Sequence, residues 1–310
     1  MRRIQYHAYG GPETMKLEDV APQPPGSGEV AVKVSFAAIN PIDWKVRNGD
    51  LKMITGKVFP RAIGSDFSGI VISVGAGVTR FKPGDAVFGL ARLKQSGALG
   101  EAVVTSESCL AKKPDSISFA DAACLGTPGV TAWNGLVDKA DLKRGQSVFI
   151  NGCTGAVGAA AVQIARMLGA IVAGSCGADA MQTARDLGVQ KVFDYRKTDL
   201  STLPDRFDVV YDTAAIMPTA VGLRLAGSNG VFADINPTPI KFLRSVLNRR
   251  LKPVVCTPRA DILDRIADAA AEGKLRLPIA ETVPLGQAIT LLTALEGGRK
   301  IGGKGLVAIG

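Results

Sequence analysis

The chain is predicted to be an α/β protein that combines a compact, barrel-like β domain with a parallel, doubly wound sheet. Three observations support this. The first third holds short β-branched runs broken by glycine and proline, the middle alternates strand-like and helical segments, and a glycine-spaced turn joins the first such strand to the first such helix. Closely spaced short strands are typical of barrels, whereas strands separated by helices indicate parallel crossover connections.

The N-terminal strands are expected at residues 29–36, 69–74 and 86–89, the last following the turn Lys82-Pro83-Gly84-Asp85. After the middle segment the chain returns to mixed character. Helices are predicted near residues 261–272 and 286–295, and a last strand at 305–309. We therefore expect one domain from residues 1–122 and 258–310, and an inserted domain from residues 123–257. A ligand site is expected in the cleft between them.

The inserted domain follows a strand–helix alternation. Strands are predicted at residues 148–150, 171–174, 191–195, 208–212 and 231–235, with helices that include 179–187 and 219–225. Right-handed βαβ crossovers would place these strands in one parallel sheet, and ligands bind beyond the carboxyl ends of such strands.

The turn after the first of these strands is the most specific signal. The backbone of such a turn and the start of the following helix can face a pyrophosphate, which predicts a dinucleotide site. The residues expected to form it are Gly152, Thr154, Gly155, Ala156, Val157 and Gly158. Cys153 stands where the usual first glycine would be, so the turn itself could differ. Cys153 is expected to be a packing residue, although a helix start could also stabilise a thiolate.

The end of the second strand bears on the choice of cofactor. It reads Gly174-Ser175-Cys176, without the carboxylate that would bind the ribose of NAD. Ser175, Tyr195 and Arg196 could instead supply donors to a 2′-phosphate, so NADPH is expected in preference to NADH. Asp179 leaves an alternative open, as a ribose ligand or as a helix N-cap.

Composition excludes several classes of protein. With 46% apolar and 21% charged residues and no apolar run of about 20 residues, the chain reads as a globular protein without a membrane span or signal peptide. We expect a cytoplasmic location. Five single cysteines argue against disulfides and thiolate metal sites.

The net charge of +9 is spread along the chain, and residues 241–252 are its densest basic stretch. We expect a solvated amphipathic face there and no nucleic-acid or membrane partner. An anionic membrane surface or RNA remains the alternative. Residues 236–252 could also line a pocket or a dimer edge.

Several motifs, taken together, resemble those of zinc-independent quinone oxidoreductases in the medium-chain dehydrogenase/reductase superfamily, and especially its enone and alkenal reductases. They are residues 40–49, 64–69, 81–85 and 129–133, the glycine turn, and residues 303–307. The resemblance spans nearly the whole chain. It implies a GroES-like catalytic domain around a Rossmann domain, usually in a homodimer, with hydride moving from NADPH to a quinone or an α,β-unsaturated carbonyl.

Zinc alcohol dehydrogenases of the same superfamily are the competing assignment. Catalytic zinc needs three protein ligands. The segment of the family's first ligand cysteine is here Asn40-Pro41-Ile42-Asp43, and its Gly-His-Glu segment is Gly64-Ser65-Asp66. The only histidine is His7, which is expected to be a surface or strand residue. No metal site is predicted.

Without a metal, the substrate carbonyl must be polarised by a cation or a hydrogen-bond donor. The resemblance places Lys45 beside the nicotinamide, where its ammonium group could bond the nicotinamide ribose, the enolate oxygen or both. A solvated surface lysine is the alternative. Asn40 could donate to the substrate or the ribose, or could cap the turn before Pro41. Asp43 could orient Lys45 or form a local Asx turn. Trp44 is expected to pack or to border the pocket.

Two further residues are expected near the nicotinamide. Thr131 matches a family threonine, although it could simply bond its own helix backbone. Asn236 follows the strand predicted at residues 231–235.

The leading functional prediction is an NADPH-dependent, zinc-independent reductase. The alternatives are an NADPH-binding adaptor or redox sensor without turnover, and a membrane-surface or RNA-binding role through residues 241–252.

Overall fold

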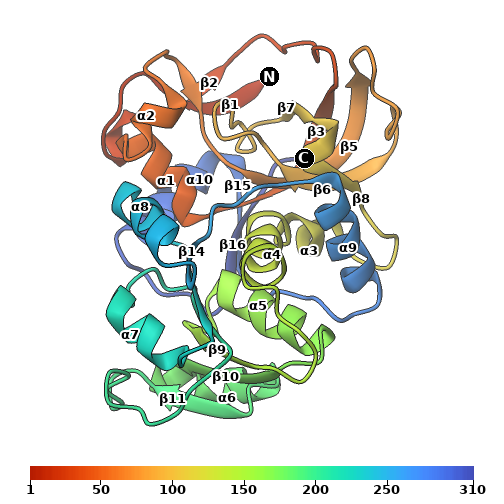
Figure 1. Cartoon of the computed structure of the whole chain (residues 1–310). Helices are drawn as coiled ribbons and strands as arrows, with labels where there is room; N and C mark the ends of the chain where they lie inside the picture. The colour runs from red at the N-terminus through yellow and green to blue at the C-terminus, as the bar shows by residue number, and fades with distance from the viewer. The chain divides into compact units, whose positions relative to one another are not determined.

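The computed structural model describes all 310 residues, and the chain divides into two compact units (Figure 1). Unit 1 comprises Met1–Thr127 and Pro258–Gly310, and unit 2 comprises Pro128–Thr257. The first division lies a few residues beyond the expected 122/123 boundary. The reason is local, since α3 (Phe119–Ala123) packs on strands β3, β5 and β6 of unit 1.

Unit 1 contains two sheets, a large one that is mostly antiparallel and a small one of three strands. The long strand β3 (Glu29–Ala38) pairs with β5 (Asp66–Val74) on one side and β16 (Lys304–Ala308) on the other. The large sheet runs in the order β15 (Ile279–Pro284), β16, β3, β5, β6 (Ala86–Leu90) and β8 (Leu110–Lys112), with β7 (Ala102–Ser106) paired to β3. The small sheet is β2 (Met15–Asp19), β1 (Arg2–Tyr6) and β4 (Arg61–Ala62).

Helix α10 (Ala288–Glu296) packs its apolar side chains into the core of unit 1. That core gathers β-branched and aromatic side chains from the sheets, including Val32, Phe67 and Val307, together with Leu291 and Leu292 of α10. The helices of unit 1 are α1 (Pro41–Asn48), α2 (Lys52–Thr55), α3, α9 (Ala260–Ala271) and α10. The final strand thus returns to the centre of a sheet begun by the N-terminal third.

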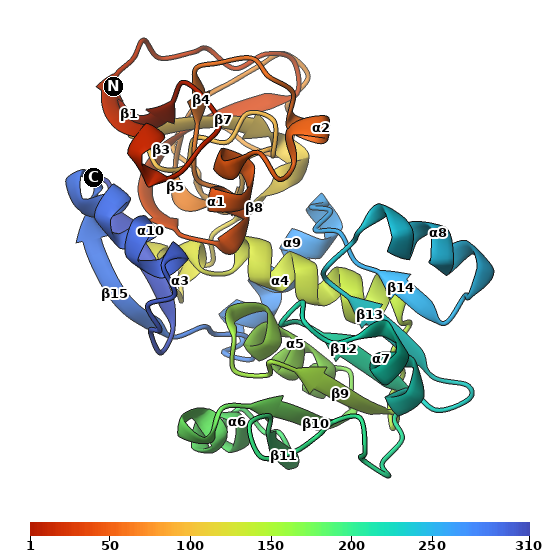
Figure 2. The ribbon, with the colours of Figure 1, turned by 90° about the vertical axis from the view of Figure 1, so that its left-hand side faces the viewer.

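Unit 2 is a six-stranded, wholly parallel sheet (Figure 2). Its order is β11 (Lys191–Asp194), β10 (Ile171–Cys176), β9 (Ser147–Asn151), β12 (Val209–Asp212), β13 (Val231–Asp234) and β14 (Leu251–Pro253). Numbered along the chain this is 3-2-1-4-5-6, the dinucleotide-binding order that the alternation predicted. The chain switches direction across the sheet between β9 and β12.

Four helices connect the strands of unit 2: α5 (Ala156–Met167), α6 (Met181–Asp186), α7 (Thr219–Leu225) and α8 (Pro239–Leu247). The predicted strands of unit 2 are confirmed to within two residues at each end, because the buried runs of a parallel sheet are strongly apolar. The division between the units falls inside α4 (Gly126–Trp133), which continues as a π-helical stretch over Asn134–Lys139. No helix has the length and apolar character that crossing a bilayer requires.

Candidate functional site

The glycine turn lies at the switch point of the unit 2 sheet. Beyond β9 the chain reverses at Gly152, whose φ of +78° is the left-handed conformation that glycine adopts most readily. The N–H groups of Gly152 and Cys153 both donate to the Ser175 carbonyl at 3.0 Å. Gly155 N–H donates to the Gly152 carbonyl at 3.0 Å. The turn is thereby fixed to the end of β10.

The N-terminus of α5 is open to an anion. Gly155 is the N-cap residue and is exposed, and no side chain caps the helix. The first N–H groups of a helix have no intrahelical acceptor and carry partial positive charge. A Cβ atom added at Gly155 would contact only the Gly152 carbonyl oxygen, at 3.4 Å. The site therefore has the donors and the space that a pyrophosphate needs.

The packing behind the turn explains the other residues of the motif. A Cβ atom at Gly158 would lie 2.0 Å from the Gly152 carbonyl oxygen, so only glycine lets α5 approach the turn this closely. Cys153 is fully buried, and burial, with its neighbour Cys176, raises the pKa of its thiol to about 12. The expected packing role of Cys153 is confirmed, since a thiol with this pKa stays protonated near neutral pH.

Ser175 is not placed to meet a phosphate, which corrects the sequence-based expectation. It is fully buried, and its hydroxyl donates to Asn151 Oδ1 at 2.6 Å, while Asn151 Nδ2 donates to Asp212 Oδ1 at 2.8 Å. This chain of bonds crosses β10, β9 and β12. A central strand covered on both faces directs its side chains into the interior, and Ser175 follows that rule.

Tyr195 and Arg196 are exposed at the carboxyl end of β11, next to the end of β10. The Arg196 guanidinium lies 5.5 Å from the centre of the Tyr195 ring, and Tyr195 N–H donates to the Cys176 carbonyl at 3.2 Å. Both side chains are available to a ligand beyond the strand ends. Asp179 is exposed in the same region and caps no helix, because Gly177 is the N-cap residue of the short 3-10 turn there.

The loop after β12 is a part of the site that the sequence reasoning missed. The Asp212 carboxylate accepts from the backbone N–H groups of Ala214 and Met217, at 3.1 and 2.7 Å. Ala215 has a φ of +63°, which is unusual for a residue with a side chain. The Thr213 hydroxyl donates to the Asn151 carbonyl at 2.6 Å, which fixes this loop beside the glycine turn. An aspartate ending a strand and followed by small residues was the available signal.

Asn236 is exposed just beyond β13, and its amide lies 3.5 Å from the Ala215 carbonyl oxygen. It therefore borders the same strand ends, as predicted from its position. Thr131 is buried in α4, where its carbonyl accepts from the Tyr211 hydroxyl at 2.7 Å. The Thr131 hydroxyl makes no hydrogen bond in the structure.

In unit 1, α1 holds the three residues predicted to be catalytic. Asn40 is the N-cap residue, Pro41 opens the helix, and Gly49 ends it with a φ of +90°. Lys45 is exposed, and its ammonium group has no hydrogen-bond or ion-pair partner. The opposite face carries Arg47, which is fully buried. The unpaired ammonium group of Lys45 therefore lies on a helix whose other face is held in place by Arg47.

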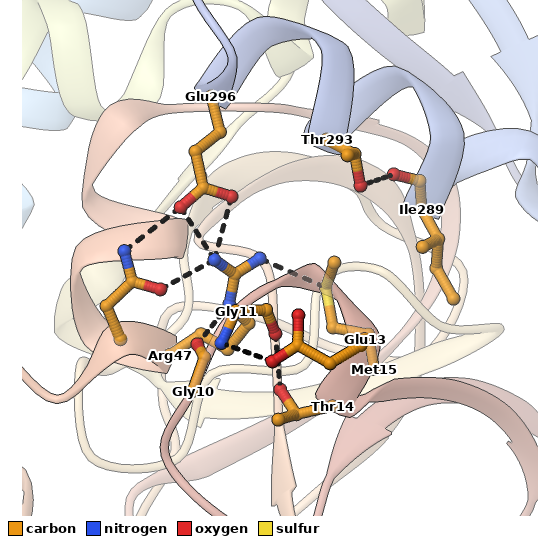
Figure 3. A network of polar contacts seen from close by, with 10 residues as sticks. Gly10, Gly11, Glu13, Thr14, Met15, Arg47, Ile289, Thr293 and Glu296 are labelled. Atoms are coloured by element: carbon orange, nitrogen blue, oxygen red, sulfur yellow. Dashed lines mark hydrogen bonds and ion pairs between the residues drawn. The ribbon is translucent and has the colours of Figure 1, made fainter.

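The Arg47 anchor joins three parts of unit 1. Its guanidinium donates to both carboxylate oxygens of Glu296 at 2.7 Å, to the Gly10 carbonyl at 3.1 Å and to the Asn48 side chain at 2.6 Å (Figure 3). Burial alone would raise the pKa of Glu296, but the bonds from Arg47 and Asn48 bring it below its ordinary value. Helix α1 is thus tied to α10 by a charge-assisted pair.

The side chain of Asn40 is part of a buried hydrogen-bond network and is not available to a ligand. Its Nδ2 donates to Asp66 Oδ2 at 3.0 Å and to the Ala38 carbonyl at 3.2 Å. Its Oδ1 accepts from the Lys304 ammonium at 2.6 Å, and Lys304 also donates to the Ile39 carbonyl at 2.9 Å. Asp66 accepts in addition from the N–H and the hydroxyl of Thr127, at 2.8 and 2.6 Å. Asn40 therefore takes the alternative role, as the N-cap residue before Pro41, and its side-chain amide is not free to donate to a substrate or a ribose.

Asp43 is also internal and does not contact Lys45. Its carboxylate accepts from the backbone N–H of Asn40 at 2.8 Å and from the Ser65 hydroxyl at 2.7 Å. Burial, reinforced by the negative charge of Asp66, raises the pKa of Asp43 to about 7. Asp43 therefore fixes the start of α1, and Trp44 beside it packs against the unit 1 core.

These residues do not fit a catalytic zinc ion. The two segments that would supply ligands do meet, through Asn40 and Asp66, but a buried ammonium from Lys304 bonds to Asn40 there. A divalent cation would be repelled by that charge. Among residues 1–310 there is no group of three potential metal ligands, and His7 is an exposed partner of Glu18.

Comparisons with known proteins agree with this architecture. Residues 26–142 match the family model described as "Alcohol dehydrogenase GroES-like domain", and residues 187–304 match the one described as "Zinc-binding dehydrogenase". The chain is 31% identical to the "Chloroplast envelope quinone oxidoreductase homolog" of Arabidopsis thaliana over 306 residues, which are 93% of this chain and 92% of that protein. The chain belongs to the quinone oxidoreductase family.

Two further comparisons support this assignment of the family and its fold. The chain is 33% identical to the "NADPH-dependent alkenal/one oxidoreductase, chloroplastic" of Arabidopsis thaliana, across 89% of this chain and 71% of that one. Among solved structures, the quinone oxidoreductase from Coxiella burnetii covers all of this chain with a TM-score of 0.89 and 28% identity, and 99% of that chain is matched. The predicted GroES-like and Rossmann architecture of the family is confirmed.

Proposed function

We propose that this protein is an NADPH-dependent oxidoreductase that transfers hydride to a quinone or to an α,β-unsaturated carbonyl without using a metal ion. The observation that carries the proposal is the uncapped N-terminus of α5 behind an exposed Gly155, at the switch point of a 3-2-1-4-5-6 sheet. The relatives, an NADPH-dependent alkenal/one oxidoreductase and a quinone oxidoreductase homolog, support the reaction class.

The proposed choice of NADPH rests on the end of β10. Arg196 is exposed, stacks near Tyr195 and has no carboxylate partner, so its guanidinium is free to bind a 2′-phosphate. The exposed Asp179 would favour a free ribose hydroxyl instead. Measuring the affinity for both cofactors in Arg196→Ala and Asp179→Asn separates the two effects. We expect Arg196→Ala to weaken NADPH selectively and Asp179→Asn to weaken only NADH.

In the proposed reaction, hydride adds to the substrate first and a proton adds second. A bound nicotinamide would supply hydride to the β-carbon of a conjugated carbonyl. The C=C electron pair would then form the new double bond between the α-carbon and the carbonyl carbon, and the C=O π pair would move onto oxygen to give an enolate. A solvent proton would add to the α-carbon as the carbonyl re-forms. The negative charge on oxygen needs a donor, and we assign this role to the free ammonium group of Lys45. Asn40 and Asp43 hold α1 in place, since their polar atoms are bonded internally.

The test is a steady-state screen of enones, alkenals and quinones with NADPH and NADH, with and without a metal chelator. We expect turnover with NADPH that resists the chelator. Lys45→Met should lower kcat/KM by about 100-fold while leaving the Kd for NADPH unchanged. Lys57→Met, which removes another exposed lysine of unit 1, is the matched control. Tight NADPH binding without turnover on any substrate would instead support the adaptor or sensor role.

We also propose that the protein is a homodimer. Strand β14 is the outer strand of the unit 2 sheet and has no neighbour on one side, which leaves it able to pair with a second copy. Sedimentation equilibrium measures the mass in solution. A monomeric mass at micromolar concentration would contradict this proposal without affecting the proposed reaction.

A further inference from the structure

Helix α8 exposes its apolar side chains to solvent, unlike the other long helices of unit 2. It lies in the crossover from β13 to β14, where a helix ordinarily buries an apolar face against the sheet. No residue of α8 is buried. Its apolar side chains are instead the most exposed group of large hydrophobic residues in unit 2, namely Ile240, Phe242, Leu243, Val246 and Leu247. Leu247 is 87% exposed and Val246 is 75% exposed.

The polar side of α8 is the side that contacts the protein. The Lys241 ammonium forms an ion pair with the fully buried carboxylate of Asp234, at the end of β13. The Thr238 hydroxyl caps the helix by accepting from Lys241 N–H. Helix α8 packs beside β14, at the outer edge of the sheet (Figure 2). At 100° per residue, the five apolar side chains fall within an arc of about 160° that points away from these contacts.

The surroundings of this helix are strongly basic. Residues 235–260 contain no aspartate or glutamate and six cations, which are Lys241, Arg244, Arg249, Arg250, Lys252 and Arg259. Arg244 and Arg249 are exposed, and neither has a hydrogen-bond or ion-pair partner from its side chain. Arg250, in contrast, is bonded to backbone carbonyls of Gly230 and Leu223. Two unpaired cations therefore flank the apolar face.

We propose that α8 docks on the surface of a membrane that contains anionic lipids. Its apolar side chains would enter the boundary between headgroups and acyl chains, while Arg244 and Arg249 would contact lipid phosphates. An exposed apolar arc flanked by free cations is what interfacial helices present to bilayers. RNA would match the charge alone and would leave four aliphatic side chains in water. This proposal does not rest on the proposed reaction, because docking can be measured without substrate.

The test is co-sedimentation of the purified full chain with vesicles of phosphatidylcholine alone, or of phosphatidylcholine with one-quarter phosphatidylglycerol. We expect binding to the anionic vesicles that weakens at high salt, and little binding to the neutral ones. Two double variants, Leu243→Ser with Leu247→Ser and Arg244→Glu with Arg249→Glu, should each lower the partition coefficient at least tenfold.

Matched controls make the same number of apolar-to-serine or charge-reversing changes while leaving α8 intact. Val58→Ser with Ile72→Ser removes two exposed aliphatic residues of unit 1, and Lys33→Glu with Lys57→Glu reverses two exposed cations of unit 1. Neither should change vesicle binding. Unchanged NADPH affinity in every variant shows that unit 2 remains folded.

Four results would overturn the proposal. The first is an absence of partitioning to anionic vesicles by the unmodified chain. The second is equal partitioning by the α8 variants and the controls. The third is self-association that the Leu243→Ser and Leu247→Ser changes abolish, without any vesicle binding, which would assign the face to a second copy of the chain. RNA binding without vesicle binding would equally reject a lipid partner.

Discussion

Two buried carboxyl groups lie near one buried cation, Lys304, at the start of α1. Asp43 and Asp66 are both internal, and Lys304 supplies the only ammonium group bonded into their network. Burial raises the pKa of both carboxyl groups, that of Asp43 to about 7. Ionisation of Asp43 near neutral pH therefore acts against the folded state.

Asp43→Asn tests this at single-residue level. A carboxyl group whose pKa is higher in the folded than in the unfolded chain binds more protons when folded, so its contribution to stability is complete below about pH 4 and is lost as pH rises through 7. The free energy of unfolding of the wild type should fall relative to Asp43→Asn by up to about 1.4 kcal/mol per pH unit in that window. Urea unfolding followed through Trp44, in a Trp133→Phe background, measures the difference.

Asp50→Asn removes an exposed carboxylate just beyond α1 and serves as the control. Its pH profile should run parallel to that of the wild type. Parallel profiles for Asp43→Asn and the wild type would show that Asp43 does not titrate between pH 4 and pH 7.

Gly155→Ser probes the anion site without disturbing the turn. The φ and ψ of Gly155, −69° and 165°, suit any residue, and serine is a favoured N-cap. Its hydroxyl would bond to the N–H groups that a phosphate needs. We expect a stability change of only a few tenths of a kcal/mol and about tenfold weaker NADPH binding by fluorescence titration.

Gly158→Ala provides the contrast, since its added methyl group would meet the Gly152 carbonyl and should lower both stability and NADPH affinity. If Gly155→Ser bound NADPH as tightly as the wild type, the N-terminus of α5 would not be the phosphate site.

Single-residue roles were the hardest to predict from sequence. The glycines were identifiable because a strand and a periodic helix flank them. Ser175 was misjudged because a central parallel strand is apolar on both faces, so its pattern does not reveal which way a serine points. Lys304 was noted only as part of the family motif at residues 303–307, and its contact with Asn40 could not be predicted, since only the pairing of β16 with β3 brings its ammonium group there.

At the scale of elements, α1 is held by an ion pair that spans 249 residues of sequence. Arg47 is fully buried, so its removal would leave Glu296 and the Gly10 carbonyl without their main donor. Lys45 is on the other face of the same helix. The geometry of the proposed cation thus depends on a contact with α10.

Arg47→Leu should therefore destabilise unit 1 by about 3 kcal/mol, the usual effect of breaking a buried pair. Arg299→Leu, which removes an exposed pair with Glu281, should change stability by less than about 1 kcal/mol. Urea unfolding read through Trp44 measures both. Equal effects of the two substitutions would mean that the Arg47 contact contributes no more than a surface pair.

Elements with a strong apolar period were predicted well, among them β9, α5, α7 and β16. Short strands such as β4 and β14, and helix α1 with its charged sequence, were not expected because pairing and packing specify them rather than local pattern. Helix α8 was expected only as an amphipathic stretch. Its orientation could not be predicted, because the same pattern serves a helix turned inward or outward.

At the scale of the whole molecule, the chain has two separate apolar cores and one tryptophan in each unit, Trp44 in unit 1 and Trp133 in unit 2. NADPH is proposed to bind the glycine turn of unit 2. A ligand at 100 times its Kd stabilises the state that binds it by about 2.7 kcal/mol.

We therefore expect saturating NADPH to move the unfolding transition reported by Trp133 more than the one reported by Trp44. Thermal unfolding of Trp44→Phe and Trp133→Phe variants, with and without NADPH, measures the two shifts. Samples that contain adenosine in place of NADPH serve as the control for the unfolding temperature without the dinucleotide. Identical shifts in both variants would show that the two units unfold as a single cooperative unit.

The sheet order of unit 1 also bears on how the protein is made. Strand β16 lies between β15 and β3, yet it follows unit 2 in the chain, so it leaves the ribosome after unit 2. Until then residues 36–38 of β3 lack their partner strand and Asn40 lacks the Lys304 ammonium group. Unit 2 can complete its sheet while the large sheet of unit 1 still lacks β15 and β16. During synthesis the nucleotide-binding half should become protease-resistant first, and the half that begins the chain should be the last to close.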